Sequence, residues 1–392
     1  CAGESPGFQK GTSQRMTDLA ERDDTQARAA VSRIPLRNIW LLMLYASSLF
    51  RHHGRSMVAA ENNPEEIPAL VARILLHEVE QRLLRHLSMG YQTRRATLNR
   101  VRGRIDVLRT TSRQLLERAQ VACQFQEMTL DTPRNRYVRS ALEHLVPLLS
   151  NGPLAAQCRA MAINLRRRGI EGGMPSKGEL PSITRFGRHD AADKAMVDAA
   201  KLAFELWLPT QTAGQKLLPT PSNDPYWMRK LFEKSMAGFY HFHLPKKDWT
   251  VAAGKELKWG LTSQSAGSES IFPTMNSDII LEHKQPAQRV IIDTKFNNIL
   301  TKGWYRDKSL RSGYIYQIYT YLRTQENRTD PLSLRSAGLL LHPAVDVMLY
   351  EFVEVQGHKI HFATVDLAAD AATMTQQLLK LARDCCGITD VN

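Results

Sequence analysis

The segment that most constrains the fold is Val290–Phe296, with the sequence VIIDTKF. Its fully apolar start predicts a central strand that is buried on both faces. Because side chains alternate along a strand, Asp293 and Lys295 are expected on one side and Thr294 on the other. A charged pair at the end of a buried strand needs a compensating partner, and a divalent metal ion is the obvious one.

A second acid is expected beside this pair. The upstream segment SDIILE, residues 277–282, predicts another strand, which Asp278 opens. If the polar stretch 283–289 forms a hairpin turn, Asp278 lies across from Asp293. Two carboxylates can hold one or two Mg²⁺ ions, which prefer oxygen ligands, and Mn²⁺ is an alternative.

This cluster suits cleavage of a phosphodiester bond. The metal ion, held by Asp278 and Asp293 and by the carbonyl oxygen of Thr294, would polarise the phosphate and acidify a bound water. Lys295 would orient that water or stabilise the charge that builds on the phosphorane. Glu233, on a preceding helix, is a further candidate metal ligand, and an ordinary surface acid is an equal alternative. A salt bridge between Asp293 and Lys295 without any metal is the structural alternative for the pair.

The segment after the cluster adds candidates for the same site. Residues 314–323 predict a helix on which Gln317, a candidate catalytic residue, and Tyr321, a candidate DNA contact, share a face. The loop before it interleaves aromatic and basic residues, a pattern that suits the sugar-phosphate backbone of DNA. The basic candidates are Lys302, Arg306, Lys308 and Arg311. An ordinary basic surface loop is the alternative.

The order of predicted elements gives the fold class and the domains. Residues 201–392 predict a helix, several strands, a helix and further strands, which is an α/β pattern with a central mixed sheet flanked by helices. Residues 31–200 predict a mainly helical N-terminal domain with a short strand segment around 101–107, followed by an irregular connection over 151–181. The boundary falls within 180–225, and residues 1–30 predict a disordered leader.

Charge and composition narrow the partners. The net charge is +13, from 52 Lys and Arg against 39 Asp and Glu, which suits a polyanion such as DNA or RNA. Residues 92–120 hold eight arginines and two acids, which favours contact with DNA phosphates or an acidic protein surface, with a solvated basic face as the alternative. The five cysteines form no CxxC pair, so a reducing cytoplasm is expected. No apolar stretch is long enough to span a bilayer, and no Walker-type motif predicts nucleotide hydrolysis by this chain.

The motifs resemble a known nuclease family. Asp278, the Asp293-Thr294-Lys295 triplet, and Gln317 with Tyr321 resemble the PD-(D/E)xK nuclease core with the QxxxY helix of its RecB-like branch, although the residue directly before Asp278 is not a proline. The whole chain from Ile34 resembles McrC, the nuclease subunit of the McrBC modification-dependent restriction system. The segments that match, in order, are residues 34–39, 102–105, 131–136, 275–279, 291–296, 316–321 and 339–346.

This resemblance implies partners and an activity. McrC-like proteins join a hexameric AAA+ partner, McrB, which hydrolyses GTP and recognises methylated cytosine. The resemblance thus implies a subunit that cuts double-stranded DNA carrying modified cytosine, stimulates its GTPase and meets GTP only through that partner. The N-terminal part would dock in the ring and the C-terminal part would cut. A non-catalytic DNA-binding activator of an AAA+ motor, with a degenerate nuclease fold, is the alternative, and an RNA-binding protein is a third hypothesis based on charge alone.

Overall fold

The computed structural model describes residues 33–47, 49, 66–149, 152–173, 176, 178–188, 190–207, 225–301, 308–345 and 347–388. The predicted leader, residues 1–30, lies outside these ranges. The chain divides into two compact units. One is the continuous segment 68–207, and the other combines the residues before it with those after it.

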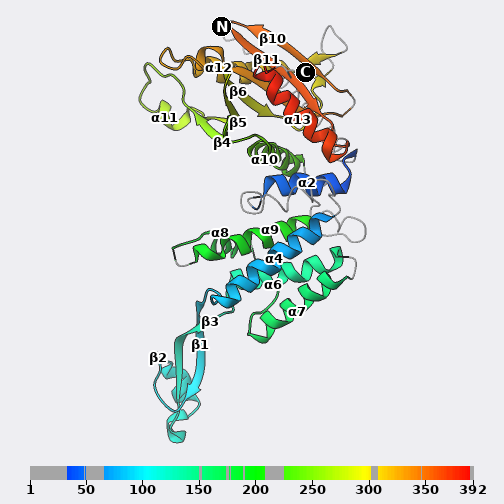
Figure 1. Cartoon of the computed structure of the whole chain (residues 1–392). Helices are drawn as coiled ribbons and strands as arrows, with labels where there is room; N and C mark the ends of the chain where they lie inside the picture. The colour runs from blue at the N-terminus through cyan, green and yellow to red at the C-terminus, as the bar shows by residue number, and fades with distance from the viewer. Residues whose placement is uncertain are drawn as a thin grey trace, which may run out of the picture. The chain divides into compact units, whose positions relative to one another are not determined.

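The second unit is built on a six-stranded mixed sheet (Figure 1). Strand β9 runs parallel to both of its neighbours, β6 and β11, and the other neighbouring pairs are antiparallel. This arrangement confirms the predicted α/β class with a mixed sheet. The strands, in order across the sheet, are β10 (Tyr350–Val355), β11 (His358–Val365), β9 (Ala337–Pro343), β6 (Ala287–Thr294), β5 (Met275–Lys284) and β4 (Trp249–Leu257).

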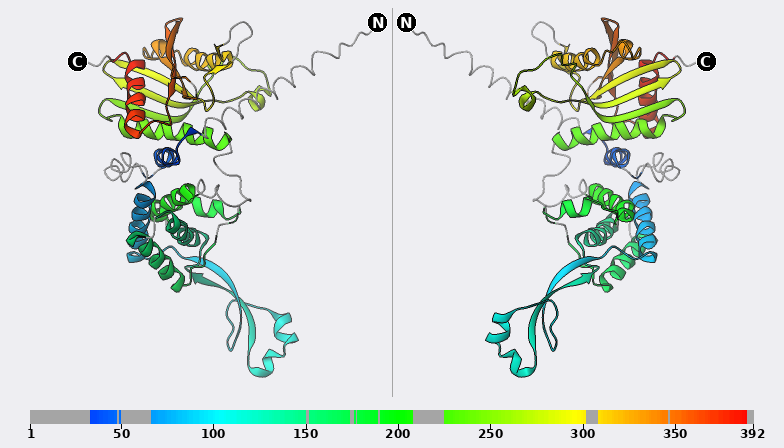
Figure 2. Two further views of the ribbon diagram at one scale, coloured as in Figure 1. Left: turned by 90° about the vertical axis from the view of Figure 1, so that its right-hand side faces the viewer. Right: turned by 90° about the vertical axis from the view of Figure 1, so that its left-hand side faces the viewer.

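Helices cover both faces of this sheet (Figure 2). Helix α12 (Ser312–Thr324) lies on one face, and Gly338 of β9 lets it approach, because a Cβ there would be 2.8 Å from Cγ1 of Ile318. Helices α10 (Pro225–His243) and α13 (Ala371–Cys385) cover the other face. They are joined by the hydroxyl of Tyr240, which donates to the carbonyl of Leu378 at 3.3 Å. The short elements of the unit are α11 (Ser268–Ile271), β7 (Leu300–Thr301), β8 (Ser309–Leu310) and η7 (Ser333–Arg335).

Helix α2 (Leu36–Ala46) also belongs to this unit, although the sequence analysis placed it in an N-terminal domain. It crosses α10 so closely that a Cβ on Gly238 would lie 1.8 Å from the carbonyl oxygen of Tyr45. The buried amide of Asn38 donates to the carbonyls of Leu367 and Ala369, both at 2.8 Å. Hydrophobic periodicity predicts a helix but not which distant segment it packs against, so chain order misplaced α2.

The continuous unit combines a helical part with an antiparallel ribbon. Its helices are α4 (Ile67–Leu84), α5 (Val107–Ser112), α6 (Pro133–Leu145), α7 (Pro153–Arg167), α8 (Leu180–Thr184) and α9 (Lys194–Trp207), with the short turns η2 (Leu115–Arg118), η3 (Val146–Leu148) and η4 (Ala191–Asp193). The ribbon consists of β1 (Gly90–Leu98), β3 (Val121–Thr129) and β2 (Arg104–Ile105), with β3 in the middle.

One prediction for this unit was wrong. Residues 151–181 were expected to be irregular, but they contain the fifteen-residue helix α7. Its buried face consists mostly of small side chains, Ala155, Cys158 and Ala162 with Leu165, so the sequence carries a weak hydrophobic signal. The strand predicted around 101–107 is confirmed by β2, but the longer ribbon strands were not predicted. Strand β1 is largely exposed and therefore shows no alternation of apolar and polar residues. In the part of the chain that the structure describes, every helix is too short or too polar to cross a membrane.

Candidate active site

The hairpin of β5 and β6 brings two aspartates together. Its register pairs Ile279 with Ile292, so one further step along the strands sets Asp278 opposite Asp293. Asp278 is the fourth residue of β5 and not its first, as expected from the sequence. Both aspartates lie on the face that carries Ile280 and Ile291, which pack in the core beneath α12.

Asp293 and Lys295 form an ion pair at the end of β6. The ammonium Nζ of Lys295 lies 2.8 Å from Oδ2 of Asp293, which confirms that the two side chains share one side. The backbone N–H of Lys295 donates to the carbonyl of Leu341 at 2.9 Å, so the chain stays attached to β9 beyond the last residue of β6. The side chain of Asp293 is 2% exposed, whereas that of Lys295 is 21% exposed. The pair therefore lies at the rim of the sheet, with its ammonium nearer to solvent.

Asp278 is held by its neighbour Thr294. Both the backbone N–H and the hydroxyl of Thr294 donate to Oδ2 of Asp278 at 2.7 Å. Hydrogen bonds to a charged carboxylate are stronger than those between neutral groups, and two of them fix its orientation. Thr294 thus positions a carboxylate in the structure, while a metal-ligand role for its carbonyl oxygen stays a prediction.

The cluster of Asp278, Asp293 and Lys295 holds two carboxylates and one ammonium, and it is largely shielded from solvent. Burial raises the pKa of Asp293 to about 6, and the carboxylates of Asp278 and Glu233 act in the same direction, against the charge of Lys295. Burial opposes the charge on Lys295, but Asp293 and Asp278 outweigh it and raise the pKa of that ammonium above its usual value. An additional cation would therefore be favoured electrostatically at this point.

The oxygen donors present fit a hard divalent cation. Oδ2 of Asp293 is buried and lies 2.8 Å from the ammonium of Lys295, and carboxylate oxygens are the ligands that a hard divalent cation prefers. Among the described residues, however, no group of three or more His, Cys, Asp or Glu side chains is arranged to hold a metal ion. The carboxylate of Glu233, on α10, accepts a hydrogen bond from Lys230 at 2.8 Å, so its ligand role stays a prediction.

Helix α12 brings two predicted residues to the same place. Nε2 of Gln317 donates to the hydroxyl of Tyr321 at 2.6 Å, which confirms that they share a face. Burial raises the pKa of Tyr321, and the charges of Asp293 and Asp278 contribute to that rise, so its hydroxyl is within electrostatic reach of both aspartates. The catalytic role of Gln317 and the DNA-binding role of Tyr321 stay predictions.

The predicted basic loop is described only in part. Lys302 and Arg306 lie outside the described residues, whereas Lys308 is exposed just before α12. Arg311 is the residue at the start of α12, and its guanidinium lies 5.8 Å from the ring centroid of Tyr314. These contacts place Arg311 beside the cluster, and its binding of DNA stays a prediction.

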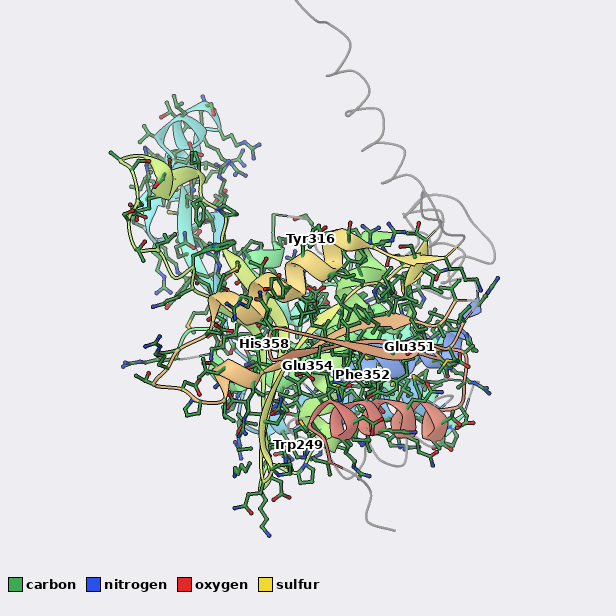
Figure 3. The ribbon with its side chains drawn as sticks, turned by 90° about the horizontal axis from the view of Figure 1, so that it is seen from above. Trp249, Tyr316, Glu351, Phe352, Glu354 and His358 are labelled. Atoms are coloured by element: carbon green, nitrogen blue, oxygen red, sulfur yellow. The ribbon has the colours of Figure 1, made fainter. Side chains whose placement is uncertain are left out.

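The structure adds three residues that the sequence analysis missed. The ammonium of Lys295 lies 5.1 Å from the ring centroid of Tyr314, and Nδ2 of Asn297 donates to the hydroxyl of Tyr314 at 2.7 Å. Nδ1 of His342 lies 3.0 Å from the carbonyl of Asn297. Tyr314 could have been found because it stands three residues before Gln317 on the same helix. The sequence does not distinguish it from Tyr316, however, which is 67% exposed and lies on the outer side of α12 (Figure 3).

The arginine-rich region forms the ribbon of the continuous unit. Its arginines are exposed, except for the half-buried Arg109. Arg94 pairs with Glu127 at 2.6 Å, and the guanidinium of Arg102 lies 4.1 Å from the ring centroid of Phe125. Helix α5 adds exposed apolar side chains, with Leu108 85% exposed. This combination of arginine and apolar surface is typical of protein interfaces. The ribbon surface therefore suits a partner protein as well as it suits DNA phosphates.

Comparison with known proteins gives one family. The family described as McrBC 5-methylcytosine restriction system component matches residues 12–167 and 226–341. A relative, the type IV methyl-directed restriction enzyme EcoKMcrBC of Escherichia coli K12, is 23% identical over 359 residues, which is 89% of this chain and 97% of that protein.

Two solved structures are more distantly similar. One is a half-complex from a tetradecameric assembly of Thermococcus gammatolerans McrB AAA+ hexamers with bound McrC, with 12% identity, a TM-score of 0.38, and coverage of 80% of this chain and 68% of that chain. The other is the McrBC complex of the same organism, with 14% identity, a TM-score of 0.31, and coverage of 46% and 49%.

Proposed function

The chain belongs to the McrBC 5-methylcytosine restriction system component family, and from this premise we propose that it is the DNA-cutting subunit of such a system. The proposed activity is that of a Mg²⁺-dependent endodeoxyribonuclease. Its catalytic centre would be a PD-(D/E)xK core made of Asp278, Asp293 and Lys295, assisted by Gln317. The DNA contacts would be Lys302, Arg306, Lys308, Arg311 and Tyr321.

The observation that carries this proposal is the convergence of two carboxylates and one ammonium at the rim of the sheet. A structural salt bridge needs one acid, but here Asp278 lies beside the Asp293–Lys295 pair and raises the pKa of Asp293. Folding brings these like charges together at an energetic cost, which is typical of sites that bind a cation or do chemistry. The protein's own residues favour a metal-binding role over a purely structural one.

Each residue would have a defined task. Asp278 and Asp293 would hold Mg²⁺ or Mn²⁺, with the Thr294 carbonyl and Glu233 as further candidate ligands, and Thr294 keeps Asp278 oriented. When bound, the metal supplies Lewis-acid activation of the phosphodiester and of a water. Lys295 places its ammonium where negative charge develops on the phosphate oxygens. Gln317 holds the hydroxyl of Tyr321 next to the cluster.

The partner follows from the family. One solved structure that resembles this chain contains McrB AAA+ hexamers with bound McrC, and the relative from Escherichia coli is a methyl-directed restriction enzyme. We propose that this chain joins an AAA+ GTPase hexamer of the McrB kind, stimulates its GTP hydrolysis, and cuts double-stranded DNA carrying methylated cytosine. GTP would bind the partner alone. The exposed arginines and apolar side chains of the ribbon are the candidate surface for that contact.

The test is cleavage of methylated and unmethylated plasmid by the chain with its GTPase partner, GTP and Mg²⁺. Replacing Asp293 or Lys295 with alanine should lower the cleavage rate by about a hundredfold or more, because a group that acts on the transition state is lost. GTP hydrolysis and complex formation should persist. Glu351→Gln, at an exposed position on β10, is the matched control and should cleave normally. Wild-type cleavage by either alanine variant would contradict the proposal.

One observation favours a second candidate, a non-catalytic DNA-binding activator of the AAA+ motor. In the described part of the chain the acids do not form a three-ligand group that could hold a metal ion. Titration calorimetry with Mn²⁺ separates the two functions. Heat of binding that disappears in Asp278→Asn supports the nuclease, whereas no binding to the wild-type chain, together with intact stimulation of GTP hydrolysis, supports the activator.

A further inference from the structure

We propose that Tyr314 positions Lys295, with its aromatic ring holding the ammonium through a cation–π contact. This inference rests on the proposed nuclease function, because it concerns the aim of the proposed catalytic ammonium. Lys295 has two partners of opposite kind, the carboxylate of Asp293 at 2.8 Å and the ring centroid of Tyr314 at 5.1 Å. The second distance is within the range of about 6 Å over which the face of an aromatic ring attracts a cation.

The ring is needed because the carboxylate has a competing task. Asp293 is one of the two residues proposed to hold the metal ion, so its charge is shared between that ion and Lys295. The side chain of Lys295 is long and has many rotamers, and a weakened carboxylate contact alone would leave it poorly aimed. A ring face attracts the ammonium without offering an oxygen ligand that would compete for the metal. Tyr314 thus keeps Lys295 in place both when the metal ion is bound and when it is absent.

The ring itself is fixed from the sheet side. Nδ2 of Asn297 donates to the hydroxyl of Tyr314 at 2.7 Å, and Asn297 is almost fully buried. The carbonyl of Asn297 in turn lies 3.0 Å from Nδ1 of His342. Because a carbonyl can only accept, that nitrogen must carry the hydrogen. A chain of contacts from β9 through residue 297 to α12 therefore sets the position of the ring.

A second cation, Arg311, also contacts the ring, so the hydrogen bond from Asn297 is needed to fix the ring. The guanidinium of Arg311 lies 5.8 Å from the same ring centroid. Arg311 is one of the candidate DNA contacts, so its own position would depend on bound DNA. The hydrogen bond from Asn297 holds the ring independently of Arg311. The contact to Lys295 is then set by the fold and not by the substrate.

The first experiment varies the electronics of the ring at constant shape. Position 314 is replaced by phenylalanine and by phenylalanines with one, two or three ring fluorines, each of which weakens the negative face of the ring. DNA cleavage is measured under single-turnover conditions with partner, GTP and Mg²⁺ at saturating DNA. Tyr314→Phe loses the hydrogen bond from Asn297, so it should be slower than the wild type and is the reference of the series. Each added fluorine should lower the rate further in steps, to about tenfold below Tyr314→Phe for the trifluoro variant. Tyr316→Leu, on the exposed side of the same helix, is the matched control and should not change the rate.

The second measurement does not depend on activity. In the free, metal-free chain with ¹³C-labelled lysine, the ε-methylene protons of Lys295 should resonate upfield because they lie near the ring. Lys295→Arg assigns the signal, and Tyr314→Leu should move it to the ordinary lysine position. If Tyr314→Leu does not fold, the fluorinated variants, which keep the shape of the ring, still decide the matter.

The outcomes separate the two proposals. A graded fluorine series together with the ring-dependent lysine signal supports the positioning role of Tyr314. A flat series, or a lysine signal that is the same in the wild type and Tyr314→Leu, overturns it even if the chain cuts DNA. If the wild-type complex cuts no DNA, the proposed function fails, and the lysine signal alone then decides whether the ring holds the ammonium.

Discussion

Thr294 shows how one residue can fix the orientation of a neighbouring carboxylate. Its N–H and hydroxyl both donate to the same oxygen of Asp278 at 2.7 Å. Thr294→Val keeps the shape and the backbone donor but removes the hydroxyl. We expect it to lower the free energy of unfolding by about 1 kcal/mol, the usual net value of a hydrogen bond, and to weaken Mn²⁺ binding.

Urea unfolding and titration calorimetry measure these two effects. Thr294→Ser is the control, because it keeps the hydroxyl and loses only a methyl group, and its metal affinity should stay near that of the wild type. A valine variant that binds Mn²⁺ as well as the serine variant would show that the backbone N–H alone orients Asp278.

His342 and Asp293 act in opposite directions when the pH falls. Burial lowers the pKa of His342 to about 3, so it stays neutral in the folded chain while the unfolded chain takes up a proton below its usual pKa of about 6.5. Stability from His342 is thus complete above about pH 6.5 and is lost as the pH falls toward 3. Burial raises the pKa of Asp293 to about 6, so the folded chain binds that proton first and gains stability as the pH falls from 6 toward 4.

A variant isolates the histidine contribution. His342→Asn keeps an N–H donor for the carbonyl of Asn297 and removes the titrating group. Between pH 7 and 4.5, its free energy of unfolding relative to the wild type should rise by about 3 kcal/mol, since one pKa unit corresponds to about 1.4 kcal/mol. Urea unfolding at both pH values measures this difference. A constant difference would mean that His342 titrates normally in the folded chain.

At the scale of elements, the crossing of α2 and α10 depends on a missing side chain. A Cβ at Gly238 would lie 1.8 Å from the carbonyl oxygen of Tyr45, which is backbone and cannot turn aside. Gly238→Ala must separate the two helices and should cost about 3 kcal/mol or more in the free energy of unfolding. Gly313→Ala, in α12, meets open space and should be neutral or slightly stabilising. Equal stability of the two variants in urea would contradict the close crossing.

The start of α6 in the continuous unit holds a buried ion cluster. The guanidinium of Arg134 donates to Asp190 at 2.7 Å and to the fully buried Asp193 at 3.2 Å, as well as to three backbone carbonyls. Lysine offers a point charge and cannot reproduce this set of donors. Arg134→Lys should therefore lower the free energy of unfolding by about 3 kcal/mol, because buried partners lose their donors.

Arg136→Lys is the comparison for this cluster. Arg136 binds Asp131 through two nitrogens at 2.7 and 2.6 Å, but its side chain is 35% exposed, so the loss should be about 1 kcal/mol or less. Differential scanning calorimetry of both variants measures the difference. Equal losses would show that burial does not increase the contribution of Arg134.

The sequence predicts an element well only where its apolar residues recur with a clear period. Strands β5 and β6 and helix α12 have strong apolar patterns, and with them the pairing of Asp293 with Lys295 and of Gln317 with Tyr321 could be predicted. Helix α7 buries mostly small side chains and the ribbon strand β1 is exposed, so neither gives a strong pattern. Asn297 and His342 reach the site through contacts between separate elements, which local patterns do not encode.

At the scale of the whole molecule, the order of the chain differs from the order of its units. The continuous unit, 68–207, is inserted in the sequence between α2 and α10, which pack against each other in the other unit. The residues of α2 that are almost fully buried include Leu41, Leu42 and Met43. A C-terminal piece cut at the predicted boundary would therefore lack part of its own core, whereas the inserted unit has all of its elements in one stretch.

This architecture predicts how fragments behave. Residues 66–207 should unfold cooperatively when produced alone. Residues 208–392 should be much less stable than the same unit in the whole chain, because α10 loses its cover and the carbonyls of Leu367 and Ala369 lose the amide of Asn38. A flexible linker that joins residues 33–50 to the start of the 208–392 fragment should restore stability, and the same fusion with Asn38→Ala should restore less of it. Urea unfolding followed by circular dichroism measures each fragment, and a 208–392 piece as stable as its α2 fusion would show that α2 is dispensable for the sheet unit.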